Sequence, residues 1–247
     1  MNWADPPDAE RLLGEARQSG SGEVALWAQV EGSPACAANV GLTLLSPFGL
    51  SGVDLVISGP NLGRNTGRSF MLSSGTIGAA IEASFVAGVR AIALSFAYDR
   101  NVAEYSTEQV DTACDVAVRV VLALYANWPS APSRVGLFSV NVPVALSAGM
   151  DTRVITTHVL RDDMGALYLR RDTQPEPNPD SELRHRVALR FCVDWSRQGE
   201  GAVNWVGSDL WAVRQGWVSV TPLSLSSLSL GVAHTDPALG AIFDLFR

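Results

Sequence analysis

Three short apolar runs, each separated from the next by a helical pattern, constrain the fold of this chain more than any other feature. The runs span residues 53–58, 90–96 and 135–142, and their apolar residues fall on both faces, which is typical of strands buried in a parallel sheet. Apolar residues recur at helical spacing between the runs, at 74–88 and 108–126. This alternation predicts an α/β fold: a three-layer, Rossmann-like, mostly parallel sheet with right-handed crossovers and helices on both faces.

Weaker signals extend this pattern along the chain. Residues 23–30 alternate in side-chain direction and predict a strand. Ser33 is a good N-cap and Pro34 suits the first helical position, so a helix is predicted over 33–45. A later helix and a later strand are expected at residues 209–213 and 217–221.

The character of the chain changes between residues 153 and 195. Strand-like pieces occur at 153–160, 166–171 and 187–193, and a polar, proline-rich turn at 174–180 joins the last two. These pieces favour a β-hairpin arm over about residues 151–204, protruding from a single domain whose core covers about 17–150 and 205–225. Because exposed strand edges need covering, we expect a homo-oligomer formed through this arm.

Composition excludes several functional classes. The formal net charge of −7 argues against long nucleic acid as a partner, since that partner requires a basic face. The chain has no lysine, which excludes a Walker-type loop and Schiff-base chemistry. No apolar run reaches the ~18 residues of a membrane span, and the acidic N-terminus is not a secretory signal. Cys36, Cys114 and Cys192 are predicted to be buried free thiols of a cytoplasmic protein, in preference to a disulfide or a metal site.

The segment with the most chemical information is residues 58–67, which leaves the carboxyl end of the first apolar run. Ligands of open α/β sheets bind at that edge. Asn61 and Asn65 supply side-chain oxygens that suit hard cations and amides that suit phosphate. The segment also contains the glycines that let a backbone approach an anion closely, namely Gly59, Gly63 and Gly67.

A helix start follows this loop. Ser74, Gly75 and Thr76 stand at the beginning of the predicted helix, with Ser73 or Ser74 as its cap. Exposed N–H groups and the helix dipole attract anions there. Each feature alone is commonly a turn or a cap. Together, an Asn/Gly loop and a Ser-Gly-Thr helix start at one sheet edge predict a phosphate-binding site.

At this point the sequence resembles a known family. The stretch VDLVISGPNLGRNTG, followed by LSSGTIGAA and GVRAIALSFAY, is similar to the signature of the SurE nucleotidase and phosphatase family. The likeness is greatest to fungal intracellular members, some of which are fused to a tubulin-tyrosine-ligase-like domain. Residues 32–36 resemble the family's Gly-Thr-Pro helix start, 139–143 its Asn-Val-Pro strand end and 208–222 its C-terminal strand, so the resemblance spans roughly residues 17–222.

The resemblance implies an activity and a cofactor. Members hydrolyse phosphomonoesters, typically nucleoside 5′- or 3′-monophosphates, with Mg²⁺ or Mn²⁺ held by two adjacent aspartates, a serine and an asparagine. Asn61 matches that asparagine, and Ser19 matches the serine, with Ser21 as a competitor. Phosphate binding is expected at Asn65, Ser74, Gly75 and Thr76.

The two aspartates, which follow the first strand of the family, have no match here. Asp5 and Asp8 precede Ser19 but follow no predicted strand. Asp54 lies at the wrong end of its strand, roughly 13 Å from the loop at ~3.3 Å per residue. We therefore expect that the family's first strand is missing, that the catalytic residues are unknown, and that the chain has little or no phosphatase activity. Neutral Asn and Ser ligands bind Mg²⁺ weakly without a carboxylate.

Two functions stay open on the sequence. One is a metal-dependent phosphomonoesterase, and the other is a non-catalytic SurE-fold module for oligomerisation or weak nucleotide binding. A dinucleotide-binding oxidoreductase is disfavoured, because no GxGxxG follows a strand. His158, His185 and His234 lie far from Asn61 in the sequence and are not expected in the site.

Overall fold

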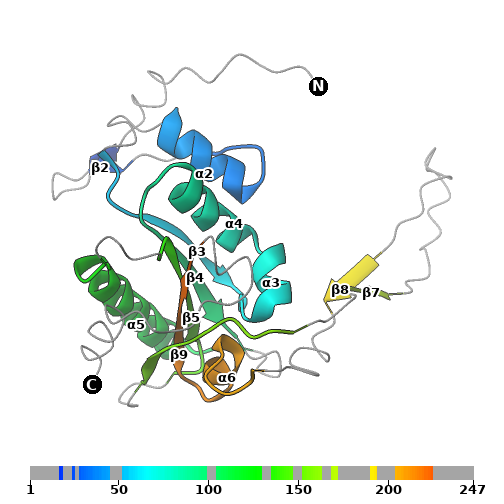
Figure 1. The fold of residues 1–247 in the computed structure, drawn as a ribbon. Helices are drawn as coiled ribbons and strands as arrows, with labels where there is room; N and C mark the ends of the chain where they lie inside the picture. Colours follow the sequence, from blue (N-terminus) through cyan, green and yellow to red (C-terminus); the bar gives the residue numbers. More distant parts are fainter. Residues whose placement is uncertain are drawn as a thin grey trace, which may run out of the picture.

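The computed structural model of the chain describes residues 17–18, 24–25, 28–44, 52–98, 104–129, 135–146, 152–162, 168–171, 190–193 and 204–224 (Figure 1). Several predictions lie outside these ranges and are neither confirmed nor contradicted. They concern the aspartates Asp5 and Asp8, the serines Ser19 and Ser21, the histidines His185 and His234, and the proline-rich turn at 174–180.

A five-stranded sheet forms the centre of the molecule. Its strand order is β3-β4-β5-β9-β6, and three of its four pairings are parallel, while β9 runs antiparallel to β5. The predicted α/β fold with a mostly parallel sheet is therefore confirmed. The strands are β3 (Val56–Leu62), β4 (Ala91–Ala97), β5 (Leu137–Pro143), β6 (Val154–Thr156) and β9 (Val218–Leu223).

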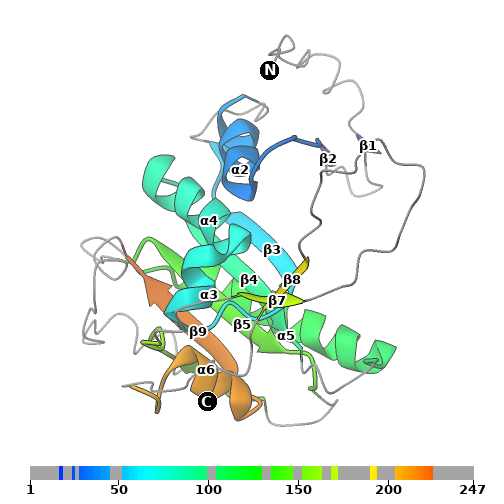
Figure 2. The ribbon, with the colours of Figure 1, turned by 90° about the vertical axis from the view of Figure 1, so that its right-hand side faces the viewer.

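Helices cover both faces of this sheet (Figures 1 and 2). Side chains of α5 pack with Phe138 and Val140 on one face, and those of α4 pack with Ala93 and Leu137 on the other, so a three-layer arrangement results. The helices are α2 (Pro34–Thr43), α3 (Gly67–Ser73), α4 (Gly75–Ile81), which continues as the π-helical η2 (Glu82–Val86), α5 (Thr107–Ala126) and α6 (Asp209–Arg214).

The handedness of the crossovers departs from the prediction. Strands β3, β4 and β5 are parallel and adjacent in that order. The first connection carries α4 on one face, and the second carries α5 on the other. Two connections that advance in the same direction on opposite faces have opposite hands. One of them is therefore left-handed, against the strong general preference for right-handed crossovers.

Local capping signals in the sequence are confirmed. The Ser33 Oγ accepts a hydrogen bond of 3.2 Å from the Cys36 N–H, with Pro34 as the first residue of α2. The cap of α4, which the sequence left between two serines, is Ser74, whose Oγ accepts from the Ile77 N–H at 3.1 Å. Short side-chain acceptors at these positions satisfy N–H groups that the helix itself leaves unpaired.

Strand β3 differs from its predicted form in two ways. It begins at Val56 and runs through Asn61 to Leu62, so half of the predicted loop is strand. Among the described strands it also lies at the edge of the sheet, and Ile57 is 46% exposed, so the prediction of a strand buried on both faces is wrong for β3. Apolar residues at every position do not distinguish an edge strand from a central one.

The boundary of the predicted arm is also corrected. Val154–Thr156 pair with β9 and so belong to the central sheet and not to the arm. Beyond them, β7 (Tyr168–Arg171) and β8 (Arg190–Val193) form an antiparallel pair that lies outside the main body in Figure 1. Near the N-terminus, β1 (Arg17–Gln18) pairs with β2 (Val24–Ala25), and residues 28–30 are not strand, so the strand predicted over 23–30 is shorter.

The two cysteine thiols that the structure describes lie at the surface. Cys36 and Cys114 are free but exposed, so the prediction of buried thiols is wrong for both, and the side chain of Cys192 lies outside the described part.

In the described ranges no single helix has the length and apolar character to cross a bilayer. One helix pair, Gly67–Ser73 with Gly75–Val86, meets the test by length and composition and is bent by 71°.

Helix α5 allows a direct test of the core. Leu124 is fully buried against the sheet, whereas Leu122, two residues earlier, is 60% exposed. We expect Leu124→Ala to lower the free energy of unfolding by about 2–5 kcal/mol, because it removes buried methyl groups and leaves a cavity. Leu122→Ala, the matched control, should change it by less than about 0.5 kcal/mol. Equal losses in chemical denaturation would contradict this packing of α5.

Candidate phosphate-binding site

A row of polar side chains crosses the sheet near the carboxyl ends of its parallel strands. Asn61 of β3 is the register partner of Ser95 in β4, and Ser95 is the partner of Asn141 in β5. Ser95 is 1% exposed and Asn141 is fully buried. On the opposite face the same strands present apolar side chains to α5. On the face that α4 covers, the buried side chains therefore change from apolar to polar toward the carboxyl ends of the strands. On the face that α5 covers they stay apolar.

A bulge in β3 brings Asn61 into this row. The register between β3 and β4 shifts between Ser58 and Asn61, so β3 holds one extra residue there. Gly59 lies in the bulge with a φ of +110°, a conformation that side-chain-bearing residues rarely adopt. Without the extra residue, Pro60 would oppose Ser95. The Gly-Pro pair, joined by a cis peptide bond, thus sets which side chain of β3 faces the site.

The Asn61 carboxamide is the hub of a hydrogen-bond network. Its Oδ1 accepts from the Ser95 Oγ at 2.7 Å, from the Thr76 Oγ1 at 3.0 Å and from the Asn65 Nδ2 at 3.0 Å. Its Nδ2 donates to the Gly63 carbonyl at 3.2 Å. One side chain therefore ties together β3, β4, the following loop and the start of α4.

Asn65 is held from three directions. Its Nδ2 donates to the Ser95 Oγ at 2.7 Å as well as to Asn61, and its backbone N–H donates to the Asn141 Oδ1 at 2.8 Å. Asn65 itself is 8% exposed. The Asn141 Nδ2 is buried and has no hydrogen-bond partner among the described residues. The loop is thus anchored to the floor of the sheet at a defined position.

The start of α4 faces this network. Thr76 contacts Asn61 directly, and the Ser74 Oγ, which accepts from the Ile77 N–H, retains its own proton for a ligand. Gly75 and Thr76 are the first two residues of the helix, so their N–H groups have no partner one turn back. The α4 start therefore offers N–H and O–H donors and a favourable helix dipole to an anion.

Two buried aspartates lie behind the loop. The Asp209 carboxylate accepts from the Gly67 N–H at 2.9 Å, and the Asp162 Oδ1 accepts from the Ser69 N–H at 3.3 Å. Asp209 is 2% exposed and Asp162 1% exposed. Gly67 has a φ of +77°, and a Cβ on it would come within 2.7 Å of the Asp162 carboxylate, so this position requires glycine.

Burial dominates the protonation of both groups. It raises the pKa of Asp209 to about 7 from 3.8, against the lowering effect of the N–H groups of Gly67, Leu160 and Leu210, and the nearby Asp162 charge adds to the rise. Burial also raises the pKa of Asp162, against the N–H of Ser69 and the charge of Arg68.

The chain is similar to known proteins over most of its length. Residues 10–164, more than half of the chain, match the family described as Survival protein SurE. The 5′-nucleotidase SurE 1 of Thermus thermophilus is 30% identical over 215 residues, which cover 87% of this chain and 72% of that protein. The chain belongs to the SurE family.

Two other similar proteins match the chain over different lengths. The probable tubulin–tyrosine ligase PBY1 of Saccharomyces cerevisiae is 39% identical over 130 residues, 52% of this chain, but the chain spans 16% of that protein. The crystal structure of the SurE protein of Aquifex aeolicus superposes with a TM-score of 0.52 and 23% identity, covering 88% of this chain and 74% of that one. This structure supports the fold alone.

The structure brings most of the predicted SurE site residues together. Asn61, Asn65 and Thr76 are linked by hydrogen bonds, and Ser74 and Gly75 adjoin Thr76 at the same helix start. Gly59, Gly63 and Gly67 all have positive φ, at +110°, +148° and +77°. Asp54 is exposed and precedes β3, away from this network, as expected.

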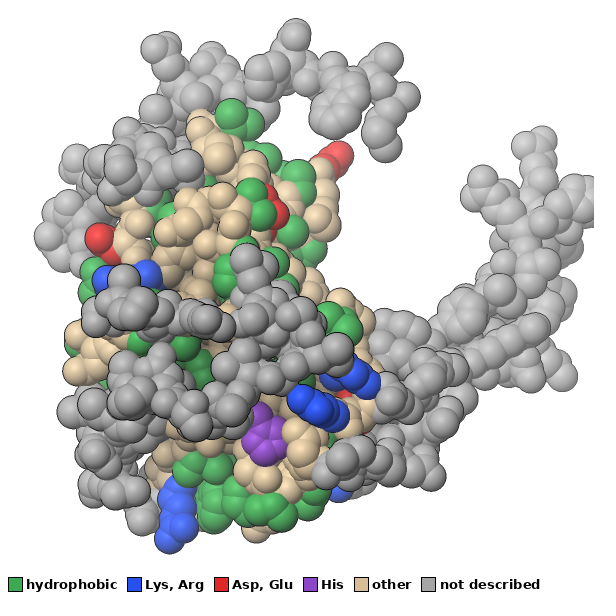
Figure 3. Space-filling view, viewed as in Figure 1, with side chains coloured by type: hydrophobic (Ala, Val, Ile, Leu, Met, Phe, Trp, Pro, Cys, Tyr) green, Lys and Arg blue, Asp and Glu red, His purple; other side chains and the backbone are tan. Residues whose placement is uncertain are grey.

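Sequence reasoning missed Ser95, Asn141, Asp162 and Asp209. A signal existed for Asn141, because a polar residue in an otherwise apolar strand needs a partner. His158 hydrogen-bonds the Asn204 carbonyl at 2.9 Å through Nε2 and takes no part in the network around Asn61. Figure 3 shows a histidine side chain (purple) with arginine side chains (blue) near it on this face of the molecule.

A divalent cation does not fit the described residues on their own. The predicted metal ligand among them, the Asn61 Oδ1, is neutral and already accepts three hydrogen bonds. In the described ranges no group of three or more His, Cys, Asp or Glu side chains is placed to hold a metal ion. Hard cations require anionic oxygens, so a complete site needs carboxylates from elsewhere.

The raised pKa of Asp209 predicts a pH dependence of stability. Because the folded state binds this proton more tightly than the unfolded chain, the carboxyl stabilises the fold most below about pH 4, and this contribution is lost as the pH rises to about 7. The shift sets an upper limit of about 4 kcal/mol. Between pH 4.5 and 7.5, wild type should lose more unfolding free energy than Asp209→Asn, which does not titrate. A ¹³C carboxyl titration of Asp209 with a midpoint below 4 would contradict the assignment.

Proposed function

We propose that this chain binds nucleoside monophosphates through the Asn61 network and the start of α4, as a SurE-type, metal-dependent phosphomonoesterase whose hydrolytic activity requires metal-binding carboxylates in addition to the described residues. The observation that carries this proposal is the convergence of Asn61, Asn65 and Thr76 at the carboxyl edge of the sheet. Two relatives that are 30% identical to this chain are 5′-nucleotidases of the SurE family, which supports the same activity.

The geometry supports a defined division of roles. The N–H groups of Gly75 and Thr76 and the Ser74 hydroxyl bind the phosphoryl oxygens, because a helix start presents such donors in one direction. Asn65 is the expected donor on the opposite side, and because its N–H groups already donate to Asn61, Ser95 and Asn141, it would exchange one of these hydrogen bonds for one to the phosphate. These neutral donors hold the phosphate in one orientation, which is the contribution of this chain to a displacement at phosphorus.

A divalent metal remains part of the proposal, with Asn61 and Ser19 as two of its ligands. Bound Mg²⁺ or Mn²⁺ would polarise the phosphoryl group and lower the pKa of a water molecule. The alternative is a non-catalytic SurE module that binds nucleotide without hydrolysis. The described residues support this alternative, because among them no group of three or more His, Cys, Asp or Glu side chains could hold a metal ion.

One experiment distinguishes the two functions. Phosphate release from AMP and from 3′-AMP is measured with Mn²⁺, with Mg²⁺ and with EDTA, alongside equilibrium binding of AMP. Metal-dependent release supports the enzyme, and saturable binding without release supports the non-catalytic module. Absence of both release and binding would contradict the proposed function.

Two variants test the assigned roles. Ser74→Ala should raise KM, or Kd where the chain binds without hydrolysis, by about tenfold with little change in kcat, because it removes a contact shared by ground state and transition state. Ser106→Ala is the matched control, since Ser106 caps α5 in the same way, on the other face of the sheet. It should cost about 1 kcal/mol of stability and leave KM unchanged.

In a chain with the metal-binding aspartates in place, Asn61→Ala should reduce turnover by orders of magnitude and weaken Mn²⁺ binding, because a metal ligand is lost and three donors lose their shared acceptor. Its control is Asn39→Ala, which breaks a bond of 2.7 Å to Glu82 outside the site. Equal effects of Asn61→Ala and Asn39→Ala on turnover and Mn²⁺ affinity would remove Asn61 from the site.

We further propose that the chain forms a homo-oligomer through the predicted β-hairpin arm, of which the described β7–β8 pair forms part and from which Val154–Thr156 are excluded. Replacing residues 172–189 with a short Gly-Ser linker should shift the mass measured by light scattering at micromolar concentration to that of a monomer. The unfolding midpoint of the core should stay unchanged. A monomeric wild-type chain at this concentration would contradict the proposal.

A further inference from the structure

The start of α3 is capped by residues that lie far away in the sequence. Its N-cap residue, Thr66, makes no side-chain hydrogen bond to the helix. Instead, the Gly67 N–H donates to the Asp209 Oδ2, the Arg68 N–H to the Leu160 carbonyl at 2.9 Å, and the Ser69 N–H to the Asp162 Oδ1. The three N–H groups at the start of α3 are thus all satisfied by partners more than ninety residues further along the chain.

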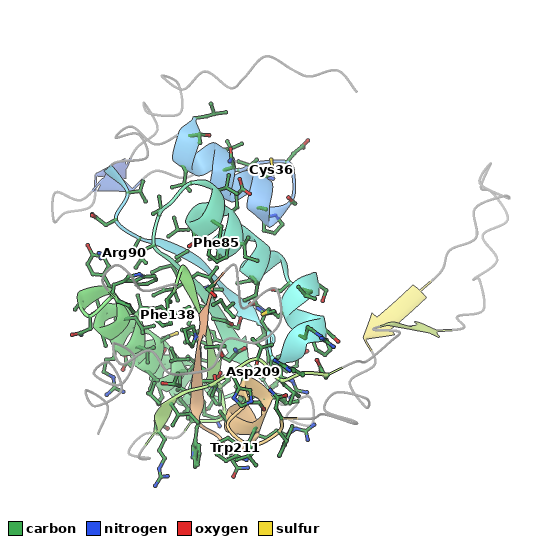
Figure 4. All side chains as sticks on the ribbon, in the orientation of Figure 1. Cys36, Phe85, Arg90, Phe138, Asp209 and Trp211 are labelled. Carbon is green, nitrogen blue, oxygen red and sulfur yellow. The ribbon has the colours of Figure 1, made fainter. Side chains whose placement is uncertain are left out.

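Asp209 joins this helix start to two other segments. It is the first residue of α6, and Figure 4 shows it at the start of that helix, next to α3. Its Oδ1 accepts from the Leu160 N–H at 3.1 Å and from the Leu210 N–H at 2.8 Å, while its Oδ2 accepts from Gly67. Its own N–H donates to the His158 carbonyl at 2.9 Å. A single buried carboxylate therefore fixes three chain segments.

The segment it fixes contains a residue of the proposed site. Asn65 and Gly67 are two residues apart, and the backbone between them is held at both ends: the Asn141 Oδ1 accepts from the Asn65 N–H and the Asp209 carboxylate from the Gly67 N–H. This short segment carries the Asn65 side chain, which donates to Asn61 and Ser95. Releasing Gly67 frees one end of it.

We propose that Asp209 is a positioning residue for phosphate-ester binding, which acts through the Gly67 N–H to hold Asn65 in its place beside Asn61. The inference rests on the proposed function for its ligand, but not for its geometry. Asp162 accepts from the same helix two residues further along, at the Ser69 N–H, while the Gly67 N–H donates to Asp209. Comparing variants of the two aspartates therefore distinguishes the positioning of Asn65 from a general stabilisation of α3.

The test compares Asp209→Asn with Asp162→Asn in the full chain. The asparagine at 209 keeps an oxygen for Leu160 and Leu210 but turns an NH₂ group toward the Gly67 N–H, so that one contact is lost. We expect the KM for AMP, or its Kd if the chain binds without hydrolysis, to rise about tenfold with kcat within about twofold. Asp162→Asn should leave KM within about twofold at a comparable loss of thermal stability. Equal KM values in the two variants would overturn the proposal.

Amide hydrogen exchange tests the same proposal without activity. In Asp209→Asn the Asn65 and Gly67 amides should exchange at least about tenfold faster than in wild type, whereas in Asp162→Asn the increase should be confined to Ser69. If wild type neither binds nor hydrolyses AMP, the proposed function fails, yet exchange at Asn65 still decides the positioning role. Unchanged exchange at Asn65 in Asp209→Asn would overturn it.

A measurement on wild type covers the case in which Asp209→Asn does not fold. Native-state exchange as a function of denaturant gives the opening free energy of each amide. The Gly67, Leu160 and Leu210 amides share one carboxylate, so they should open together with a common denaturant dependence. A separate, lower-energy opening of Gly67 would contradict the coupling.

Discussion

The row of buried polar side chains across β3, β4 and β5 is the constraint on which the rest of the structure depends. Ser95 and Asn141 lie in the interior with at most 1% exposure, and buried polar groups are costly unless they are hydrogen-bonded. Asn61 and Asn65 supply most of the partners, and both require the chain after β3 to return over the sheet. The loop geometry therefore follows from the need to satisfy the floor beneath it.

This arrangement explains how an acidic chain can offer an anion site. The described donors around Asn61 are amides, hydroxyls and helix N–H groups, and none of the predicted site residues is a cation. Oriented dipoles in a partly buried place attract a phosphate without a high net positive charge. The total charge of −7 thus argues against long nucleic acid but leaves a small phosphate ester compatible with the chain.

The site also depends on the C-terminal part of the molecule. The antiparallel strand β9 inserts between β5 and β6, and α6 precedes it with Asp209 at its first position. This insertion brings residues 158–162 and 208–210 against the start of α3, although they are separated from it by more than ninety positions at each bonded pair. Residues remote in sequence therefore hold the loop that carries Asn65.

The sequence by itself determined the local elements and the family. Apolar runs placed β4, β5 and α5, and the serine caps placed α2 and α4, because these signals act within a few residues. It also indicated Asn61, Asn65 and the Ser74–Thr76 helix start. Only the tertiary structure decided that β3 lies at the edge of the described sheet and that one crossover is left-handed. It also decided that Ser95, Asn141, Asp162 and Asp209 support the loop. Sheet order and long-range hydrogen bonds arise from the packing of segments that are distant in the sequence. Local sequence patterns do not specify which of these segments pack together.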